Sequence, residues 1–178
     1  MLHNPRGVVS AQPDPGQIPA IRLLTRDGLY GESSTISDRD TKLAPVGRLD
    51  KDSRGLLLLS DDGVVAKAVI GPSSALDKEY RVAVMGELTD RKLALLSHGL
   101  ELDDRELKPA EVEMISEQRL RIVLTEGRNR QIRRMCELVD LKVVDLFRAR
   151  VGPLTLGDMP EGKWRPLTPA ERSALIAG

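Results

Sequence analysis

Short apolar segments separated by turn residues determine which folds this chain can adopt. Residues 112–115 and 120–124 are mostly apolar, and polar residues 116–118 lie between them, which predicts a β-hairpin. Four consecutive leucines, residues 56–59, lie between Gly55 and Ser60 and predict a short buried strand. Residues 80–85 alternate in polarity, so they predict another strand. Further strands are expected over residues 142–151 and 164–167.

Helices are predicted between these strands from caps and breakers. Ser60 is expected to cap a helix that ends near Ile70 before Gly71 and Pro72, and Thr89 is expected to cap a second helix through residue 97. The other two predicted helices are residues 130–139, with Asn129 as cap, and residues 169–176. Residues 11–19 and 31–42 are polar or rich in Pro and Gly and are expected to be loops. Hairpins mixed with isolated helices predict an α+β fold on a largely antiparallel sheet.

Composition excludes several classes of protein. The 178 residues suffice for one domain with a sizeable core, and 40% hydrophobic with 30% charged residues is typical of a globular protein. No apolar run reaches the roughly 18–20 residues that span a membrane, and the N-terminal residues lack the pattern of a signal peptide. The single cysteine, Cys136, excludes an intramolecular disulfide and a metal site built from cysteines. We therefore expect a cytoplasmic protein.

One stretch of the chain is strongly basic although the formal net charge is zero. Residues 119–150 carry nine Lys or Arg against four acidic residues. On a helix over residues 130–139, an apolar face is expected to form the core; it comprises Ile132, Met135, Cys136 and Val139. Arg130 and Arg134 then point to solvent, and Arg133 lies at the boundary, where its guanidinium can meet a partly buried carboxylate.

Two interpretations of the arginine cluster remain open. Each arginine by itself can be a solvated side chain on a surface helix. The whole cluster, Gly-Arg-Asn-Arg-Gln-Ile-Arg-Arg at residues 127–134, favours phosphate binding, because like charges this close repel one another and a phosphate would relieve the repulsion. The helix N-terminus adds backbone N–H donors for the same phosphates.

Asp50 is the candidate for acid–base or nucleophilic chemistry. It lies between the cations Arg48 and Lys51, directly after Leu49, which is expected to point into the core. The Asp50 side chain is therefore expected at the rim of a cleft, where cations keep it ionised, as a nucleophile or base requires. Residues 52–53, Asp-Ser, are predicted to form a turn instead.

Taken together, the motifs resemble the RsuA/RluB/RluE/RluF branch of the RNA pseudouridine synthases. Gly-Arg-Leu-Asp at residues 47–50 is followed about 80 residues later by the arginine cluster, with Lys-Glu-Tyr at residues 78–80 between them. Leu-Gly-Asp-Met-Pro-Glu-Gly-Lys-Trp-Arg-Pro-Leu-Thr at residues 156–168 resembles the C-terminal signature. The similarity covers roughly residues 44–170, and the loop before residue 47 and residues 98–112 are most similar to RluF-type members.

The resemblance implies a fold and a set of roles. The fold is the pseudouridine synthase fold, a bent, mixed and mostly antiparallel β-sheet flanked by helices. Asp50 is the implied catalytic aspartate, Tyr80 the tyrosine that stacks on the target base, and Arg133 the partner of the aspartate. Residues implied to bind substrate are Arg48, Lys78, Arg128, Arg130, Arg134 and, as a pocket wall, Ile132. Members of the family need no cofactor and no metal.

The resemblance also implies a substrate. It implies isomerisation of uridine to pseudouridine, most consistently in 23S ribosomal RNA, with transfer RNA as a second possibility. Residues 1–178 are expected to be a single catalytic domain and a monomer, without the small N-terminal S4-type domain of most relatives. Asn4 stands where the family's Lys-Pro-x-Gly motif has lysine, and this difference is expected to affect RNA affinity more than catalysis. The alternatives are a non-catalytic RNA-binding module of the same fold and a protein-interaction domain.

Overall fold

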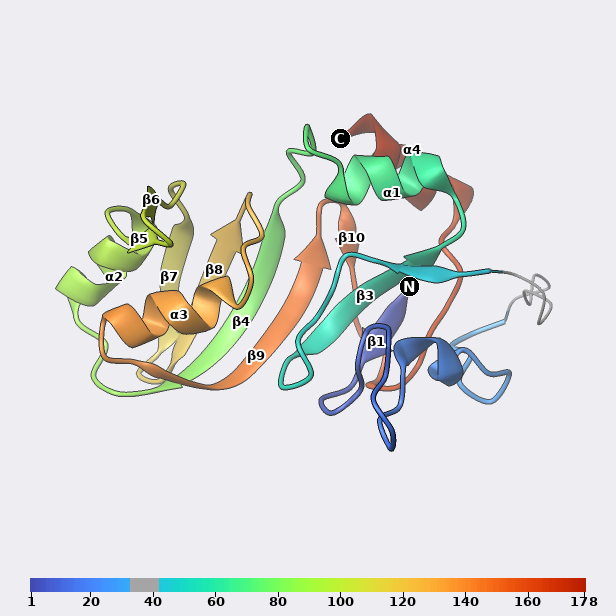
Figure 1. The fold of residues 1–178 in the computed structure, drawn as a ribbon, viewed down its shortest axis with the longest axis horizontal. Coiled ribbons are helices and arrows are strands. Elements are labelled where there is room, and N and C mark those ends of the chain that lie inside the picture. Colours follow the sequence, from blue (N-terminus) through green and yellow to red (C-terminus); the bar gives the residue numbers. More distant parts are fainter. Residues whose placement is uncertain (33–41) are drawn as a thin grey trace. The chain divides into compact units, whose positions relative to one another are not determined.

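The computed structural model describes residues 1–32 and 42–178. They form two compact units: residues 1–76 with 149–178, called unit 1, and residues 77–148, called unit 2. Both units combine antiparallel strands with helices (Figure 1), so the predicted α+β class is confirmed.

Unit 1 is built around β3 (Arg54–Ser60), which contains the predicted leucine run. β3 pairs antiparallel with β1 (Leu2–Asn4) on one side and with β2 (Ala44–Val46) on the other. β10 (Leu154–Thr155) pairs with the last residues of β9 (Lys142–Val151), and a 3₁₀ helix, η1, covers Ala20–Leu23. Side chains from distant parts of unit 1 share one buried cluster: Leu2, Val8, Ala20, Leu49, Leu57 and Trp164.

Two helices of unit 1 lie side by side, α1 (Gly63–Ile70) and α4 (Pro169–Ala177) (Figure 1). The α1 cap is Asp62, whose carboxylate accepts the Val64 N–H at 2.9 Å, so the prediction of Ser60 as cap was wrong by two residues. The Ser60 hydroxyl instead accepts the Asp62 N–H at 2.9 Å and closes the turn that leads from β3 into α1.

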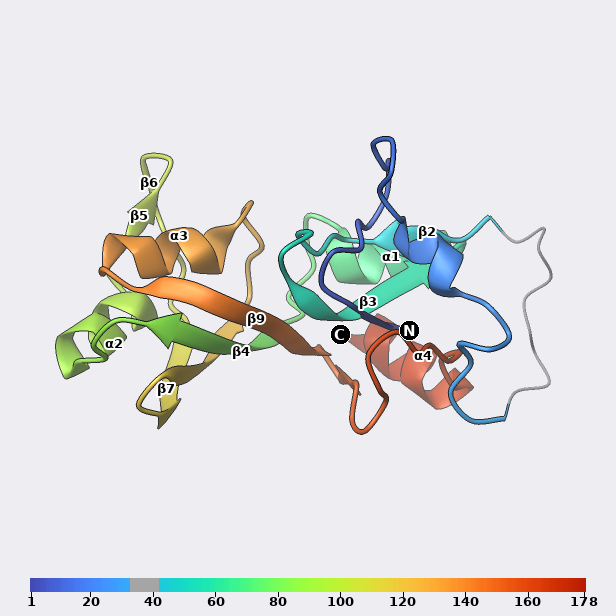
Figure 2. The same ribbon diagram turned by 90° about the horizontal axis from the view of Figure 1, so that it is seen from below.

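Unit 2 contains the predicted hairpin. β8 (Arg119–Leu124) pairs antiparallel with β7 (Glu111–Ser116) and with β4 (Lys78–Met85), and a bulge lies between Met114 and Ser116. The helices α2 (Asp90–Ser97) and α3 (Gln131–Leu138) supply apolar side chains to the same core as the strands. A second hairpin joins β5 (Glu101–Leu102) to β6 (Arg105–Glu106), and Figure 2 shows it near α3.

The structure confirms some of the other predicted elements and contradicts one of them. The Thr89 cap, the end of α1 before Gly71 and the strand over residues 142–151 are confirmed. The predicted strand over residues 164–167 is wrong, because Trp164 makes only isolated bridges to Leu2 and Leu29. β1, β2 and the β5–β6 hairpin were not predicted, since each has only two or three residues and carries no periodicity. Most of the predicted loop at residues 31–42 falls outside the described residues.

Candidate active site and nucleic-acid interface

Asp50 lies in a tight turn of unit 1. The Ser53 N–H donates to the Asp50 carbonyl oxygen at 2.9 Å, which confirms the predicted turn before Gly55. Leu49 is 6% exposed and belongs to the unit 1 core, as predicted, whereas Asp50 is half-buried and Arg48 is exposed. The Arg-Leu-Asp sequence thus anchors its middle residue and leaves the two charged side chains within reach of solvent.

The turn at residues 4–7 is structural. Asn4 is fully buried, pairs with Gly55 in the β1–β3 ladder, and donates from Nδ2 to the Val8 carbonyl at 3.4 Å. Its Oδ1 atom is buried without a hydrogen-bond partner. Gly7, at a φ of 93° that favours glycine, donates its N–H to the Lys51 carbonyl at 2.7 Å. The residue in the place of the family's lysine therefore faces the core of unit 1.

Lys78 and Tyr80 lie on β4 in unit 2. Lys78 is opposite Leu124 and Tyr80 opposite Ile122, so the two side chains share one face of the strand. Tyr80 is half-buried and packs against the unit 2 core. Burial, reinforced by the nearby positive charge of Arg148, holds the pKa of the Lys78 ammonium below its ordinary value.

The predicted apolar face of the arginine helix is confirmed. All four of its members are buried in unit 2: Ile132, Met135, Cys136 and Val139. Arg133 is half-buried, as its boundary position predicted. Ile132 packs within the core cluster that Tyr80 adjoins, and its role as a pocket wall stays a prediction.

The start of this helix differs from the prediction. α3 begins at Gln131, and its cap position is occupied by Arg130 rather than Asn129. Arg130 adopts a left-handed conformation, with φ 50° and ψ 35°, and makes no side-chain cap hydrogen bond. Its side chain is exposed, as expected for a phosphate ligand. The capping rules did not reveal this start, because here the chain enters the helix through its backbone conformation rather than through a capping side chain.

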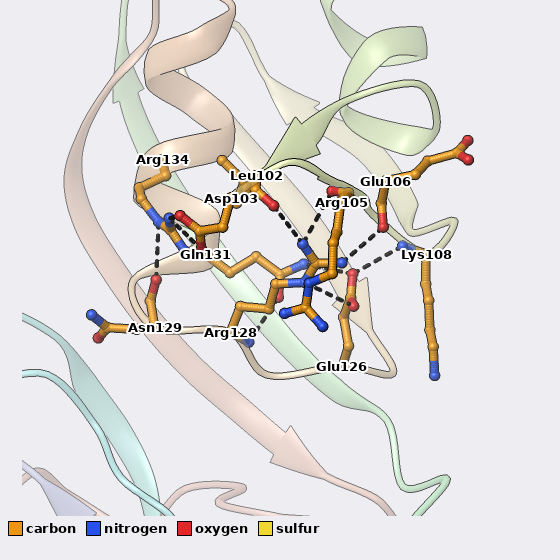
Figure 3. A network of polar contacts seen from close by, with 10 residues as sticks. All are labelled: Leu102, Asp103, Arg105, Glu106, Lys108, Glu126, Arg128, Asn129, Gln131 and Arg134. Carbon is orange, nitrogen blue, oxygen red and sulfur yellow. Dashed lines mark hydrogen bonds and ion pairs between the residues drawn. The ribbon is translucent and has the colours of Figure 1, made fainter.

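Arg128 is bound to the β5–β6 hairpin (Figure 3). Its guanidinium donates to the carbonyl oxygens of Leu102 at 2.9 Å, Arg105 at 3.2 Å and Glu106 at 2.7 Å. Its Nε atom lies 3.4 Å from the Glu126 carboxylate. These contacts occupy both terminal nitrogens and Nε, so the planar fork of N–H donors in the Arg128 guanidinium is directed at protein oxygens.

Arg134 meets the same hairpin. Its Nη1 atom lies 3.0 Å from each carboxylate oxygen of Asp103, and its Nε donates to the Asn129 carbonyl at 3.1 Å (Figure 3). The interpretation of Arg134 as a purely solvated arginine therefore needs correction. The sequence analysis did not predict this hairpin. The one available signal was Asp103-Asp104, a turn sequence that lies between Leu102 and Leu107.

The structure distributes the predicted site residues over both units. Arg48 and Asp50 belong to unit 1. The remaining predicted residues belong to unit 2: Lys78, Tyr80, Arg128, Arg130, Ile132, Arg133 and Arg134. Across residues 1–32 and 42–178, no cluster of three His, Cys, Asp or Glu side chains could hold a metal ion. Over the same ranges, no helix combines the length and the apolar character needed to cross a bilayer.

The chain is similar over most of its length to known proteins of one family. The family model described as RNA pseudouridylate synthase matches residues 1–138. Over 180 residues the chain is 34% identical to the ribosomal small subunit pseudouridine synthase A of Yersinia pestis, covering 99% of this chain and 72% of the relative. Over 162 residues it is 38% identical to the ribosomal large subunit pseudouridine synthase B of Yersinia pestis, covering 84% of this chain and 50% of that relative.

Solved structures agree on the fold. A crystal structure of a pseudouridylate synthase superimposes with a TM-score of 0.83 at 28% identity, covering 98% of this chain and 71% of the other. A chain of an archaeal box H/ACA Nop10–Cbf5 complex, with a TM-score of 0.55 and 18% identity, is similar in fold alone. The expected pseudouridine synthase fold is thereby confirmed, and the chain belongs to the RNA pseudouridylate synthase family.

Proposed function

We propose that this enzyme converts uridine to pseudouridine in ribosomal RNA and that Asp50 is its catalytic residue. The observation that carries the proposal is the family match over residues 1–138, a range that includes Asp50, Tyr80 and Arg133. The local geometry supports it, since Asp50 follows a buried leucine in a closed turn and is itself half-buried. We further propose that units 1 and 2 act together as one catalytic domain.

The reaction defines what the residues must do. The N1–C1′ bond breaks, the base turns, the C5–C1′ bond forms, C5 loses its proton to solvent and N1 gains one. The nucleotide must first leave its stack to be reached. Asp50 attacks as a nucleophile or removes a proton as a base, and Tyr80 offers its ring face to the base. Arg133 supplies the positive charge that favours an ionised carboxylate.

The basic side chains are assigned to RNA according to their contacts. Arg48 and Arg130 are exposed and are proposed to bind phosphates near the target nucleotide. Lys78 is half-buried and is also proposed to bind RNA. Arg134 is proposed to bind phosphate in exchange for Asp103, its partner in the structure. Arg128, whose fork already binds three carbonyls, is proposed to support the loop before α3.

Ribosomal RNA is proposed because the relatives named above act on it, one on the small and one on the large subunit. Large-subunit RNA is the preferred substrate, on the basis of the RluF-like sequence of residues 98–112. That segment forms the β5–β6 hairpin beside the arginine loop, where a specificity element is well placed. A ribosomal RNA substrate implies a cytoplasmic enzyme. Transfer RNA remains the second candidate.

Tritium release tests the proposal directly. RNA transcribed with uridine tritiated at C5 is incubated with the wild type, Asp50→Asn and Asp61→Asn, using small-subunit, large-subunit and transfer RNA separately. The wild type and Asp61→Asn are expected to release tritium to water, because Asp61 is an exposed carboxylate of the same unit. Asp50→Asn is expected to bind RNA without releasing tritium. Tritium release by Asp50→Asn would show that Asp50 is not the catalytic residue. No tritium release by the wild type on any of the RNAs would favour the non-catalytic RNA-binding module.

A further inference from the structure

Two residues near the N-terminus, Gly7 and Ser10, form hydrogen bonds with the residues on either side of Asp50. On the N-terminal side, the Leu49 N–H donates to the Ser10 hydroxyl at 2.9 Å, and the same hydroxyl donates to the Leu49 carbonyl at 3.0 Å. On the C-terminal side, the Lys51 carbonyl accepts the Gly7 N–H at 2.7 Å. The residue between these two attachments is Asp50.

The Ser10 contact does what a neighbouring strand would do for Leu49. A single side-chain oxygen satisfies both backbone groups of a residue whose side chain is already buried in the unit 1 core. Leu49 is thus fixed through its side chain and through both ends of its backbone. Because the peptide that follows Leu49 leads directly to the Cα of Asp50, rotation of the Asp50 turn about this point is restricted.

A hydroxyl is specifically suited to this contact. It can donate and accept at once, which neither alanine nor a backbone N–H can do. Ser10 is half-buried and is directed at Leu49, so its hydroxyl is engaged with protein rather than offered to a nucleic acid. Threonine keeps the hydroxyl, whereas alanine leaves the Leu49 N–H and carbonyl without this partner.

We propose that Ser10 is a positioning residue for the Asp50 carboxylate, an inference that rests on the proposed function of Asp50. Its hydroxyl fixes the backbone of Leu49 and thereby the direction in which Asp50 presents its side chain. Displacement of a reacting group by about 1 Å can cost about 100-fold in rate. Loss of the hydroxyl is therefore expected to lower kcat by about 10- to 100-fold. The KM for RNA is expected to stay within about twofold, because loss of the Ser10 hydroxyl does not change the contacts that bind RNA equally in the ground state and the transition state.

The test compares Ser10→Ala, Ser10→Thr and the matched control Ser74→Ala. Ser74 lies in the same unit, and its hydroxyl likewise donates to a carbonyl, that of Ala68 at 2.7 Å, and accepts an N–H, that of Leu76 at 3.5 Å. Tritium release gives kcat and KM for each protein. Ser10→Ala alone is expected to lose kcat, and Ser10→Thr is expected to restore it. An unchanged kcat, a loss confined to KM, or no restoration by threonine would overturn the proposal.

A second measurement separates this proposal from the proposed function. Hydrogen exchange of the Leu49 amide, followed by NMR, needs no activity, and its protection is expected to fall at least about tenfold in Ser10→Ala only. Absence of tritium release by the wild type would contradict the proposed function. Unchanged protection of the Leu49 amide in Ser10→Ala would contradict only the role of Ser10. If Ser10→Ala does not fold, Ser10→Cys keeps the side chain's shape with a weaker hydrogen-bonding group. Its kcat must then fall at constant KM, and a wild-type kcat would overturn the proposal.

Discussion

The Nη1 atom of Arg134 lies 3.0 Å from both carboxylate oxygens of Asp103, at the tip of the β5–β6 hairpin. The side chains are 30% and 63% exposed, respectively, so the pair is solvated and contributes only about 0.2–1 kcal/mol to stability. A phosphate can therefore replace Asp103 at little energetic cost. In the proposed role of Arg134 as a phosphate ligand, this ion pair orients the guanidinium and also competes with RNA for it.

This competition predicts opposite effects of two substitutions on RNA affinity. Asp103→Asn removes the competing carboxylate and is expected to tighten RNA binding at low salt. Arg134→Ala is expected to weaken binding and to reduce the slope of log K against log salt by about one, because one phosphate contact is lost. Titrations of RNA at several salt concentrations measure both effects.

The neighbouring Asp104 provides the control for this prediction. Asp103 and Asp104 both adopt left-handed conformations, with φ of 54° and 59°, which asparagine tolerates, so Asp→Asn strains neither position. Asp104→Asn removes the same charge from the hairpin tip without touching the pair with Arg134. Equal tightening by the two Asp→Asn variants would mean that general charge, not the ion pair, limits RNA binding.

Arg128 is expected to hold the hairpin. Its guanidinium bonds to three carbonyls of residues 102–106. Arg128→Lys keeps the charge but not the planar fork, so it is expected to lose most of these bonds and about 1.5–3 kcal/mol of unfolding free energy. Chemical denaturation measures the loss. Arg105→Ala, which removes an exposed cation from the same hairpin, is the control, and an equal loss in both variants would contradict the role of the fork.

Arg128 also shows what sequence patterns can and cannot predict. The core face of α3 follows from a period of 3.6 residues, and all four residues assigned to it are buried. The exposure of Arg130 and the boundary position of Arg133 follow from the same phase. The carbonyls that receive the Arg128 guanidinium belong to a hairpin more than 20 residues earlier, and no local pattern encodes that contact.

The same limit applies to the surroundings of Asp50. The burial of Leu49 and the turn at residues 50–53 were predictable from local sequence. The hydroxyl that binds Leu49 comes from Ser10, 39 residues away, and a serine in a loop carries no signal of its partner. Trp164 illustrates the reverse error, since a strand was expected to begin there, whereas its backbone makes only isolated bridges and its side chain belongs to the unit 1 core.

Cys136 is expected to be inert in the folded enzyme. It is fully buried, and burial raises the pKa of its thiol to about 12, so almost none is present as the reactive thiolate at neutral pH. Labelling with a thiol reagent such as DTNB at pH 8 is expected to be negligible in the native state and complete in denaturant. Fast stoichiometric labelling of the native enzyme would contradict the placement of Cys136 in the core of unit 2.

Glu171 is expected to make the stability of unit 1 depend on pH. Its carboxylate accepts hydrogen bonds from Arg165 at 2.7 and 2.8 Å and from the Thr168 N–H at 2.9 Å, in the capping box of α4. Hydrogen bonding to Arg165 lowers the pKa of Glu171 to about 2. A carboxylate whose pKa is lowered by folding contributes stability above its unfolded pKa of about 4.5, and that contribution is lost as the pH falls towards about 2.

The difference in stability between the wild type and Glu171→Gln tests this dependence, because glutamine keeps an acceptor for Thr168 without the charge. The wild type is expected to be more stable above about pH 4.5, and the two proteins are expected to converge as the pH approaches about 2. Thermal unfolding between pH 2 and pH 7 measures the difference. Glu117→Gln, at an exposed position of unit 2, is the control and is expected to show little dependence. A difference for Glu171→Gln that stays constant down to pH 2 would mean that the charge of Glu171 contributes nothing and that only its capping geometry matters.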